Sequence, residues 1–223
     1  GWTGGGQILN VLGGRTTHHV VILDDSYSMG DQSIGPGNRP AAVLAEEGRG
    51  ARTAYGRALQ ALQDLTRRLA GSEGSHQLTV MRSSRAAMSV RAGSDAGDTA
   101  ADLSAQTITA DARLINRLMS TTASPLRTDL VAALDLAGEL ISSTPADDKF
   151  LYIASDFRER DWGSAERLAE SLRGVGSDVE IRMIDCAAQP SPNLGITDLS
   201  PAPDVWVAGV PVVVSVTVHN YGQ

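Results

Sequence analysis

Short apolar runs alternate along the chain with longer stretches in which apolar residues recur at helical spacing. Residues 19–24 and 150–154 form runs typical of strands buried on both faces. Between them, apolar residues recur every three or four positions over residues 51–70 and 128–143, which predicts two amphipathic helices. Strands that alternate with helices indicate a mostly parallel α/β sheet.

Weaker patterns complete this picture of a doubly wound, Rossmann-like sheet with helices on both faces. Residues 77–82 and 179–184 have the pattern of strands, and residues 111–120 and 162–172 that of helices. We expect residues 86–91 to pair with the strand at 77–82 or to follow it at the sheet edge.

Changes in composition divide the chain into four parts. Residues 1–15 are glycine-rich without periodicity and are expected to be a linker, followed by the α/β domain at 16–187 and a second linker at 188–193. Residues 194–223 are β-rich, and valines at every second position of 212–218 predict a strand with one apolar face. Because two strands do not make a stable domain, we expect these to begin an incomplete, immunoglobulin-like β-sandwich in a fragment of a longer protein.

Composition and charge narrow the classes of function. Apolar residues make up 42% and charged residues 20% of the chain, which is typical of a soluble globular protein. The net charge of −7 disfavours a nucleic-acid surface held by phosphate contacts. Cys186 is the only cysteine, so neither an internal disulfide nor a cysteine-based metal cluster can form. No apolar run approaches the roughly 18 residues of a membrane-spanning helix.

Small oxygen-bearing side chains occur where the predicted strands end. Asp24, Ser26 and Ser28 follow the first strand directly, Asp156 follows the strand that starts near residue 150, and Thr128 opens a helix. Open α/β sheets bind their ligands at the carboxyl ends of strands. Carboxylate and hydroxyl oxygens suit a hard cation, so the five residues predict a site for Mg²⁺ or Mn²⁺.

Each part of this pattern also has a plainer explanation. Asp-x-Ser-x-Ser alone is ordinary turn sequence, and only Thr128 and Asp156 at matching places make a cation site the preferred interpretation. His18 and His19 lie at the other end of the first strand, roughly 20 Å away, and are expected to be structural or exposed. Cys186 is interpreted as a buried structural thiol.

The five residues match, in type and order, the metal-ion-dependent adhesion site of the von Willebrand factor type A domain, and the chain resembles that family over about residues 16–186. The resemblance implies that the first loop and the threonine bind the metal directly or through water, and that the second aspartate acts through water. It also implies that an Asp or Glu of a protein partner fills the open coordination position. Arg127 and Phe157 stand where glycine is common in the family.

The resemblance further implies a rim of residues around the metal that contacts the partner. The expected rim consists of Asp25, Tyr27, Arg127, Phe157 and Arg158. For Asp25, a role as a hydrogen-bond acceptor behind the metal loop and a place as a solvated loop residue remain open as alternatives.

Residues 17–29 also resemble bacterial membrane-anchored proteins of the aerotolerance-operon type. This second resemblance implies membrane helices ahead of the domain, outside this chain. We therefore expect a soluble fragment of a protein anchored in the bacterial cytoplasmic membrane, with the side of the membrane left open.

The leading hypothesis is a metal-dependent protein-interaction module without enzymatic activity. A scaffold that keeps the motif without needing metal is the first alternative, and a Mg²⁺-dependent phosphotransferase is the second. The chain lacks the Gly-x-Ser-x-Gly elbow of hydrolases, the phosphate loop and the Gly-x-Gly-x-x-Gly fingerprint, so neither an enzyme nor a bound nucleotide is expected. Ser26 stands where aspartyl phosphotransferases have their second aspartate.

Overall fold

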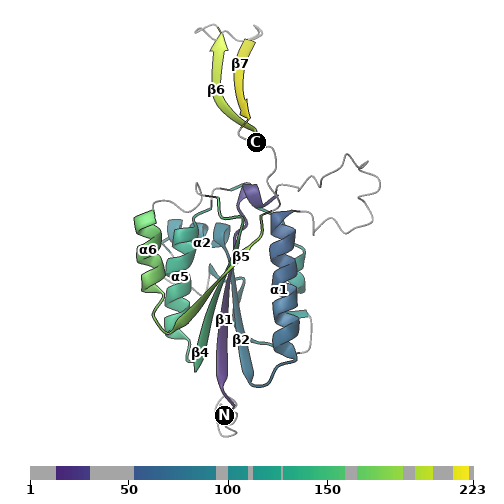
Figure 1. Ribbon diagram of the computed structural model, residues 1–223, viewed down its shortest axis with the longest axis vertical. Helices are drawn as coiled ribbons and strands as arrows, with labels where there is room; N and C mark the ends of the chain where they lie inside the picture. The colour runs from purple at the N-terminus through teal and green to yellow at the C-terminus, as the bar shows by residue number, and fades with distance from the viewer. Residues whose placement is uncertain are drawn as a thin grey trace, which may run out of the picture.

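The fold is an α/β sheet with helices on both faces, followed by a separate strand pair (Figure 1). The computed structural model describes residues 14–30, 53–93, 100–109, 113–126, 128–158, 165–187, 194–202 and 213–220. Its main sheet has five strands in the order β3-β2-β1-β4-β5. These findings confirm the predicted fold class.

Four of the five strands are parallel. They are β1 (Thr16–Leu23), β2 (Ser75–Arg82), β4 (Asp148–Ser155) and β5 (Val179–Asp185). At the carboxyl end of β1, Leu23 lies opposite Arg82 of β2 and Ala154 of β4. The segments that follow β1, β2 and β4 therefore leave the sheet at one common edge.

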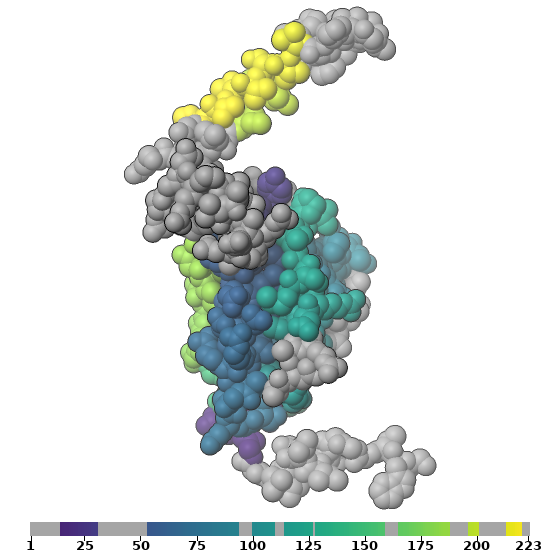
Figure 2. Space-filling view, turned by 90° about the vertical axis from the view of Figure 1, so that its right-hand side faces the viewer, coloured from purple at the N-terminus to yellow at the C-terminus, as the bar shows by residue number. Residues whose placement is uncertain are grey.

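Helices cover both faces of the sheet. Val20 and Ile22 of β1 pack on the side of α2 (Ser83–Arg91), α5 (Leu130–Ser143) and α6 (Ala165–Gly174). Val21 and Leu23 pack on the side of α1 (Ala54–Ala70) and α4 (Arg113–Met119), which Figure 2 shows with α1 in blue. This alternation explains why β1 is apolar at successive positions: both of its faces are buried.

Local signals fix the start of the two longest helices. The Thr53 hydroxyl accepts a hydrogen bond from the Gly56 N–H at the start of α1, and the Asp129 carboxylate accepts one from the Ala132 N–H at the start of α5. Asp129 directly follows Thr128, so the cap also places Thr128 at the amino end of α5.

Two elements differ from the sequence-based expectation. Residues 86–91 are not a strand but belong to α2, because a buried carboxylate caps this helix from outside its own sequence. The antiparallel edge strand is instead β3 (Leu103–Thr107), which is half-exposed, contains a bulge and has Ala105 at a φ of 41°. A short, irregular edge strand of this kind leaves little periodicity in a sequence.

Beyond β5, β6 (Leu194–Ala202) and β7 (Val213–Asn220) form a two-stranded antiparallel sheet. Register places Val214, Val216 and Val218 opposite apolar β6 residues, and Ser215 opposite Ser200, so one face is apolar as predicted. Residues 1–13 of the expected linker at 1–15, and the whole expected linker at 188–193, lie outside the described residues, and the four-part division of the chain stays a prediction. Within the described ranges, no helix is long and apolar enough to cross a membrane.

Candidate metal centre

The predicted site lies where the order of strands reverses. From β1 the chain goes first to β2 on one side and later to β4 and β5 on the other, so the crevice between β1 and β4 is a topological switch point. Ligands of open α/β sheets bind at such points, outside the carboxyl ends of the strands. Asp24 directly follows β1 and Asp156 directly follows β4.

Asp24 is fully buried and held by its neighbours. Its backbone N–H donates to the Ala154 carbonyl at 2.9 Å, which continues the sheet by one residue. Its Oδ1 accepts the Ser26 N–H at 2.9 Å, and its Oδ2 accepts the Ser155 hydroxyl at 2.6 Å. Burial raises the pKa of Asp24, and the nearby negative charge of Asp156 adds to the shift.

The two serines of the first loop meet on its inner side. The short helix η2 (Tyr27–Gly30) begins with the Met29 N–H donating to the Ser26 carbonyl at 3.0 Å. This turn brings the hydroxyl oxygens of Ser26 and Ser28 to 3.1 Å from each other, and both side chains are buried. Tyr27, between them, is 72% exposed. The alternation directs two hydroxyls inward and one aromatic ring outward.

Thr128 and Asp156 have buried side-chain oxygens that lack hydrogen bonds within the described part of the chain. The Thr128 Oγ1 and both carboxylate oxygens of Asp156 are shielded from solvent, yet they form no hydrogen bond with any residue that the structure describes. Such groups are rare in native proteins, and a bound water or ion is one of their ordinary explanations. Arg158 forms an ion pair with Asp156, with 3.0 Å between its Nε and the Asp156 Oδ2, but not in hydrogen-bonding geometry.

These residues fit a hard cation by chemistry as well as by position. The Asp24 and Asp156 carboxylates repel each other, the Ser26 and Ser28 hydroxyls meet on the loop after Asp24, and Thr128 adds a third hydroxyl, so every candidate ligand atom is oxygen. Among the described residues, no group of three or more His, Cys, Asp or Glu side chains could hold a metal. A cation here would therefore depend on the hydroxyls, which favours Mg²⁺ or Mn²⁺ over zinc. The identity of the cation stays a prediction.

The expected rim is changed at one position. Asp25 does not lie on the rim, because its carboxylate is fully buried beneath the loop at the start of α2. It accepts hydrogen bonds from the Ser83 hydroxyl at 2.9 Å and from the Ser84 N–H and hydroxyl at 2.8 and 2.6 Å. The guanidinium of Arg82 also lies beside this carboxylate, with 3.9 Å between the Arg82 Nη1 and the Asp25 Oδ2. The alternative of a hydrogen-bond acceptor behind the metal loop is the one that the geometry supports.

Three other rim residues lie in the described part of the chain. Tyr27 is exposed beside the serines, and the Arg158 side chain is 47% exposed. Phe157 has a φ of 52°, which L side chains rarely adopt, and packs against the core on the α5 side. The Ser155 hydroxyl accepts the Phe157 N–H at 3.0 Å and so links this strained turn to Asp24. Arg127 lies outside the described residues.

Sequence reasoning missed the serines that support the loop. Ser155 holds Asp24 and Phe157, while Ser83 and Ser84 hold Asp25. All three lie at the carboxyl ends of β4 and β2, the same sheet edge as Asp24. Their positions at ends of predicted parallel strands were the available signal.

A cleft of about 420 Å³ borders this supporting layer. Its walls are Arg82 at the end of β2, the first turns of α2 with Arg85 and Met88, and the 122–126 segment. The Ser124 N–H donates to the Asp25 carbonyl at 2.6 Å, which ties that segment to the metal loop. Asp102 pairs with both arginines, at 2.9 and 3.1 Å.

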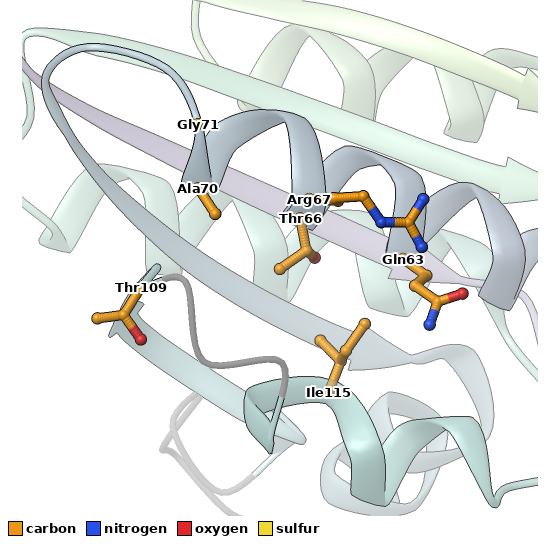
Figure 3. A pocket seen from close by; sticks show the side chains of 7 residues that line it. All are labelled: Gln63, Thr66, Arg67, Ala70, Gly71, Thr109 and Ile115. Carbon is orange, nitrogen blue, oxygen red and sulfur yellow. The ribbon is translucent and has the colours of Figure 1, made fainter.

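A second cavity, of about 320 Å³, lies away from the predicted site, against the carboxyl half of α1 (Figure 3). Its walls are mostly apolar, and its lining residues are Gln63, Thr66, Arg67, Ala70, Gly71, Thr109 and Ile115. Arg67 pairs with Asp64 on the same helix at 2.9 Å. The described lining contains no pair of acid and base that would indicate chemistry.

The histidines of β1 are structural, as expected. His18 bonds through Nε2 to the Thr79 hydroxyl at 2.8 Å, and His19 lies between the Tyr152 hydroxyl at 3.3 Å and His76 at 3.1 Å. Both are buried near the start of the strand, at the end of the sheet away from Asp24. Cys186 is also buried, and burial raises the pKa of its thiol to about 12.

Comparison with known proteins finds similarity among solved structures. The chain matches no protein-family model and no curated protein sequence. A similar chain occurs in the crystal structure of an aerotolerance-related membrane protein from Bacteroides fragilis, which carries multiple mutations to serines. The two chains are 17% identical with a TM-score of 0.42, and the match covers 90% of this chain and 81% of the other. We draw no functional argument from a likeness of this extent.

Proposed function

We propose that this chain is a metal-dependent protein-interaction module of the von Willebrand factor type A kind. In this proposal Asp24, Ser26, Ser28 and Thr128 hold Mg²⁺ or Mn²⁺, with Asp156 acting directly or through water. When bound, the cation supplies an open coordination position that accepts an Asp or Glu side chain of a protein partner.

One observation carries the proposal. At the switch point of the sheet, the Asp156 carboxylate is buried near Asp24 without a hydrogen-bond partner among the described residues, and the buried Thr128 hydroxyl before α5 has none there either. Burying unpaired polar atoms costs roughly 1–3 kcal/mol each, and more for a charged group. A bound cation would offset that cost and the repulsion between the two carboxylates.

A metal-independent scaffold remains the second candidate, because Asp24 already has protein partners. Its carboxylate accepts bonds from Ser26 and Ser155, which shape the loop without a metal. That reading accounts for Asp24 but leaves Thr128 and Asp156 unexplained. We propose neither catalysis nor nucleotide or nucleic-acid binding, and the Mg²⁺-dependent phosphotransferase is the least favoured alternative.

We also propose that the parent protein is anchored in the bacterial cytoplasmic membrane.

The partner should be captured only by metal-loaded protein. The experiment uses immobilised chain and an extract of the native host, with excess Mg²⁺, with chelator, and with Asp156→Asn in Mg²⁺. We expect a partner to be captured in the first condition and lost in the other two. Chelator removes the cation that joins the chain to the partner's Asp or Glu, and Asp156→Asn weakens the binding of that cation.

A matched control is Asp148→Asn, which neutralises an aspartate at the opposite end of the same strand, where it pairs with Arg15 at 2.6 Å. This variant should capture the partner as the parent does. If the partner is captured equally well with chelator present, the metal-independent scaffold is favoured. If the parent hydrolyses a phosphoester and Asp156→Asn does not, the phosphotransferase is favoured.

A further inference from the structure

The ion pair between Arg158 and Asp156 occupies the carboxylate that the proposed cation would share. The guanidinium Nε lies 3.0 Å from the Asp156 Oδ2, and the Asp156 side chain is only 5% exposed. The Arg158 side chain is 47% exposed, so it approaches this buried carboxylate from the solvent side. Its positive charge therefore stands at the mouth of the site.

We propose that Arg158 alternates between two carboxylates: that of Asp156 before the cation binds, and that of the acidic partner afterwards. This inference rests on the proposed function, because it requires both a cation and a carboxylate ligand. Arg158 would then be the residue that makes cation binding and partner binding depend on each other.

Charge provides the first step. Within the described structure, Asp156 forms no hydrogen bond, and the positive charge that contacts its carboxylate is the guanidinium of Arg158. A divalent cation drawn to Asp24 and Asp156 competes with the guanidinium for the same oxygen atoms and repels it. Arg158 therefore weakens cation binding, and because its guanidinium remains accessible to solvent we expect at most about a fivefold change in affinity.

Geometry provides the second step. Arg158 is two residues beyond Asp156, after the strained turn at Phe157. The Phe157 ring packs against the core and its N–H is bound by Ser155, so the backbone on which Arg158 stands is fixed while its side chain remains exposed. A guanidinium released from Asp156 stays at the rim, where planar paired donors suit an incoming carboxylate.

The test measures Mg²⁺ affinity by calorimetry at low salt for the parent, Arg158→Gln and Arg158→Lys. We expect Arg158→Gln to bind Mg²⁺ roughly two- to fivefold more tightly, because the competing charge is gone. Arg158→Lys keeps the charge and should stay near the parent. Arg15→Gln removes an exposed, paired arginine at the other end of the sheet and should leave affinity unchanged.

A second measurement follows the Arg158 Nε–H signal by NMR, with acetate as the carboxylate probe. The signal should move when Mg²⁺ is added, and acetate should move it again only in the presence of Mg²⁺. Equal or weaker Mg²⁺ binding by Arg158→Gln, or an Arg158 signal indifferent to Mg²⁺, would overturn the alternation while leaving the metal site intact. A parent chain that binds no Mg²⁺ would remove the proposed function and this inference together.

Discussion

Thr128 and Thr79 are both buried threonines, but their hydroxyls are in opposite situations. Thr79 Oγ1 accepts the Ala105 N–H at 3.0 Å and bonds to His18 at 2.8 Å. Thr128 Oγ1 has no hydrogen-bond partner. In the proposed function this unpaired oxygen is a ligand of the cation, which gives the two threonines opposite expected effects.

Thr128→Val should therefore leave the metal-free protein as stable as the parent, since no protein hydrogen bond is lost. Thr79→Val should lower the free energy of unfolding by about 1–3 kcal/mol, because it leaves buried partners unpaired. Urea denaturation in chelator measures both. In Mg²⁺ titrations the order reverses: Thr128→Val should lose affinity and Thr79→Val should keep it.

Two outcomes would contradict this assignment. A Thr128→Val variant as unstable as Thr79→Val would show that the hydroxyl has a structural partner. Unchanged Mg²⁺ affinity would remove Thr128 from the ligand set.

At this scale, residue type and position relative to strand ends led to the candidate residues Asp24, Ser26, Ser28, Thr128 and Asp156, whose role as a cation site stays a prediction. The direction of a neighbouring side chain was not predictable. Asp25 points under the loop because two serines and a backbone N–H at the end of β2 receive it there. These partners lie about 58 residues away in sequence, and no local pattern pairs them with Asp25.

Among the elements, α2 depends most on a partner outside its own sequence. Its N-cap residue, Arg82, makes no capping hydrogen bond through its side chain, and its first turn contains no acidic residue. The Asp25 carboxylate takes that role by accepting the Ser84 N–H. The loop after β1, residues 24–30, and α2 are therefore joined through one buried acid.

Asp25→Asn should lower the free energy of unfolding by about 1–3 kcal/mol, because the charge that Arg82 and both serines surround is lost. Asp129→Asn at the cap of α5 is the matched control, and it should cost less than about 0.5 kcal/mol since asparagine caps equally well. Thermal and urea unfolding in chelator would measure both. Parent-like stability of Asp25→Asn would restore the rim position first expected for this residue.

The same dependence explains which elements could be predicted. The helices α1 and α5 carry their own caps and apolar stripes, so their patterns were sufficient. Residues 86–91 resembled a strand because their helix begins at a distant carboxylate. β3 was not anticipated because its pairing with β2 is bulged and half-exposed. Elements stabilised mainly by tertiary contacts leave the weakest trace in sequence.

For the whole molecule, the parallel arrangement of β1, β2 and β4 separates two polar regions at opposite ends of one sheet. The acidic oxygens gather after the strands, and a histidine cluster lies near their beginnings. Both regions are buried in the same core, so both affect global stability. The alternation of strands and helices in the sequence predicted that the acidic oxygens lie at one edge of the sheet. The contact between His19 and His76 could be predicted only once β1 and β2 were known to be neighbours.

The histidine cluster should make the fold sensitive to mild acid. Burial lowers the pKa of His19 from 6.5 to about 4, with His76, His18 and Arg182 adding to the shift, and burial with Lys149 lowers that of His18 to about 4. Between these values the unfolded chain binds more protons than the folded one. The contribution of these two histidines to the free energy of unfolding is therefore complete above pH 6.5, falls as pH drops toward 4, and levels off below that.

His19→Gln tests this directly by removing one titrating ring while keeping a polar side chain. Its free energy of unfolding at pH 7 should be lower, because stacking on Phe150 at 5.3 Å is lost. Between pH 7 and 4.5, the free energy of unfolding of His19→Gln should fall less than that of the parent, and the difference should be at most roughly 3 kcal/mol. Burial raises the pKa of Asp24, which acts in the opposite direction, so the comparison is between variants in chelator. His219→Gln, on exposed β7, should follow the parent profile, and a parallel His19→Gln profile would mean that His19 titrates normally in the folded protein.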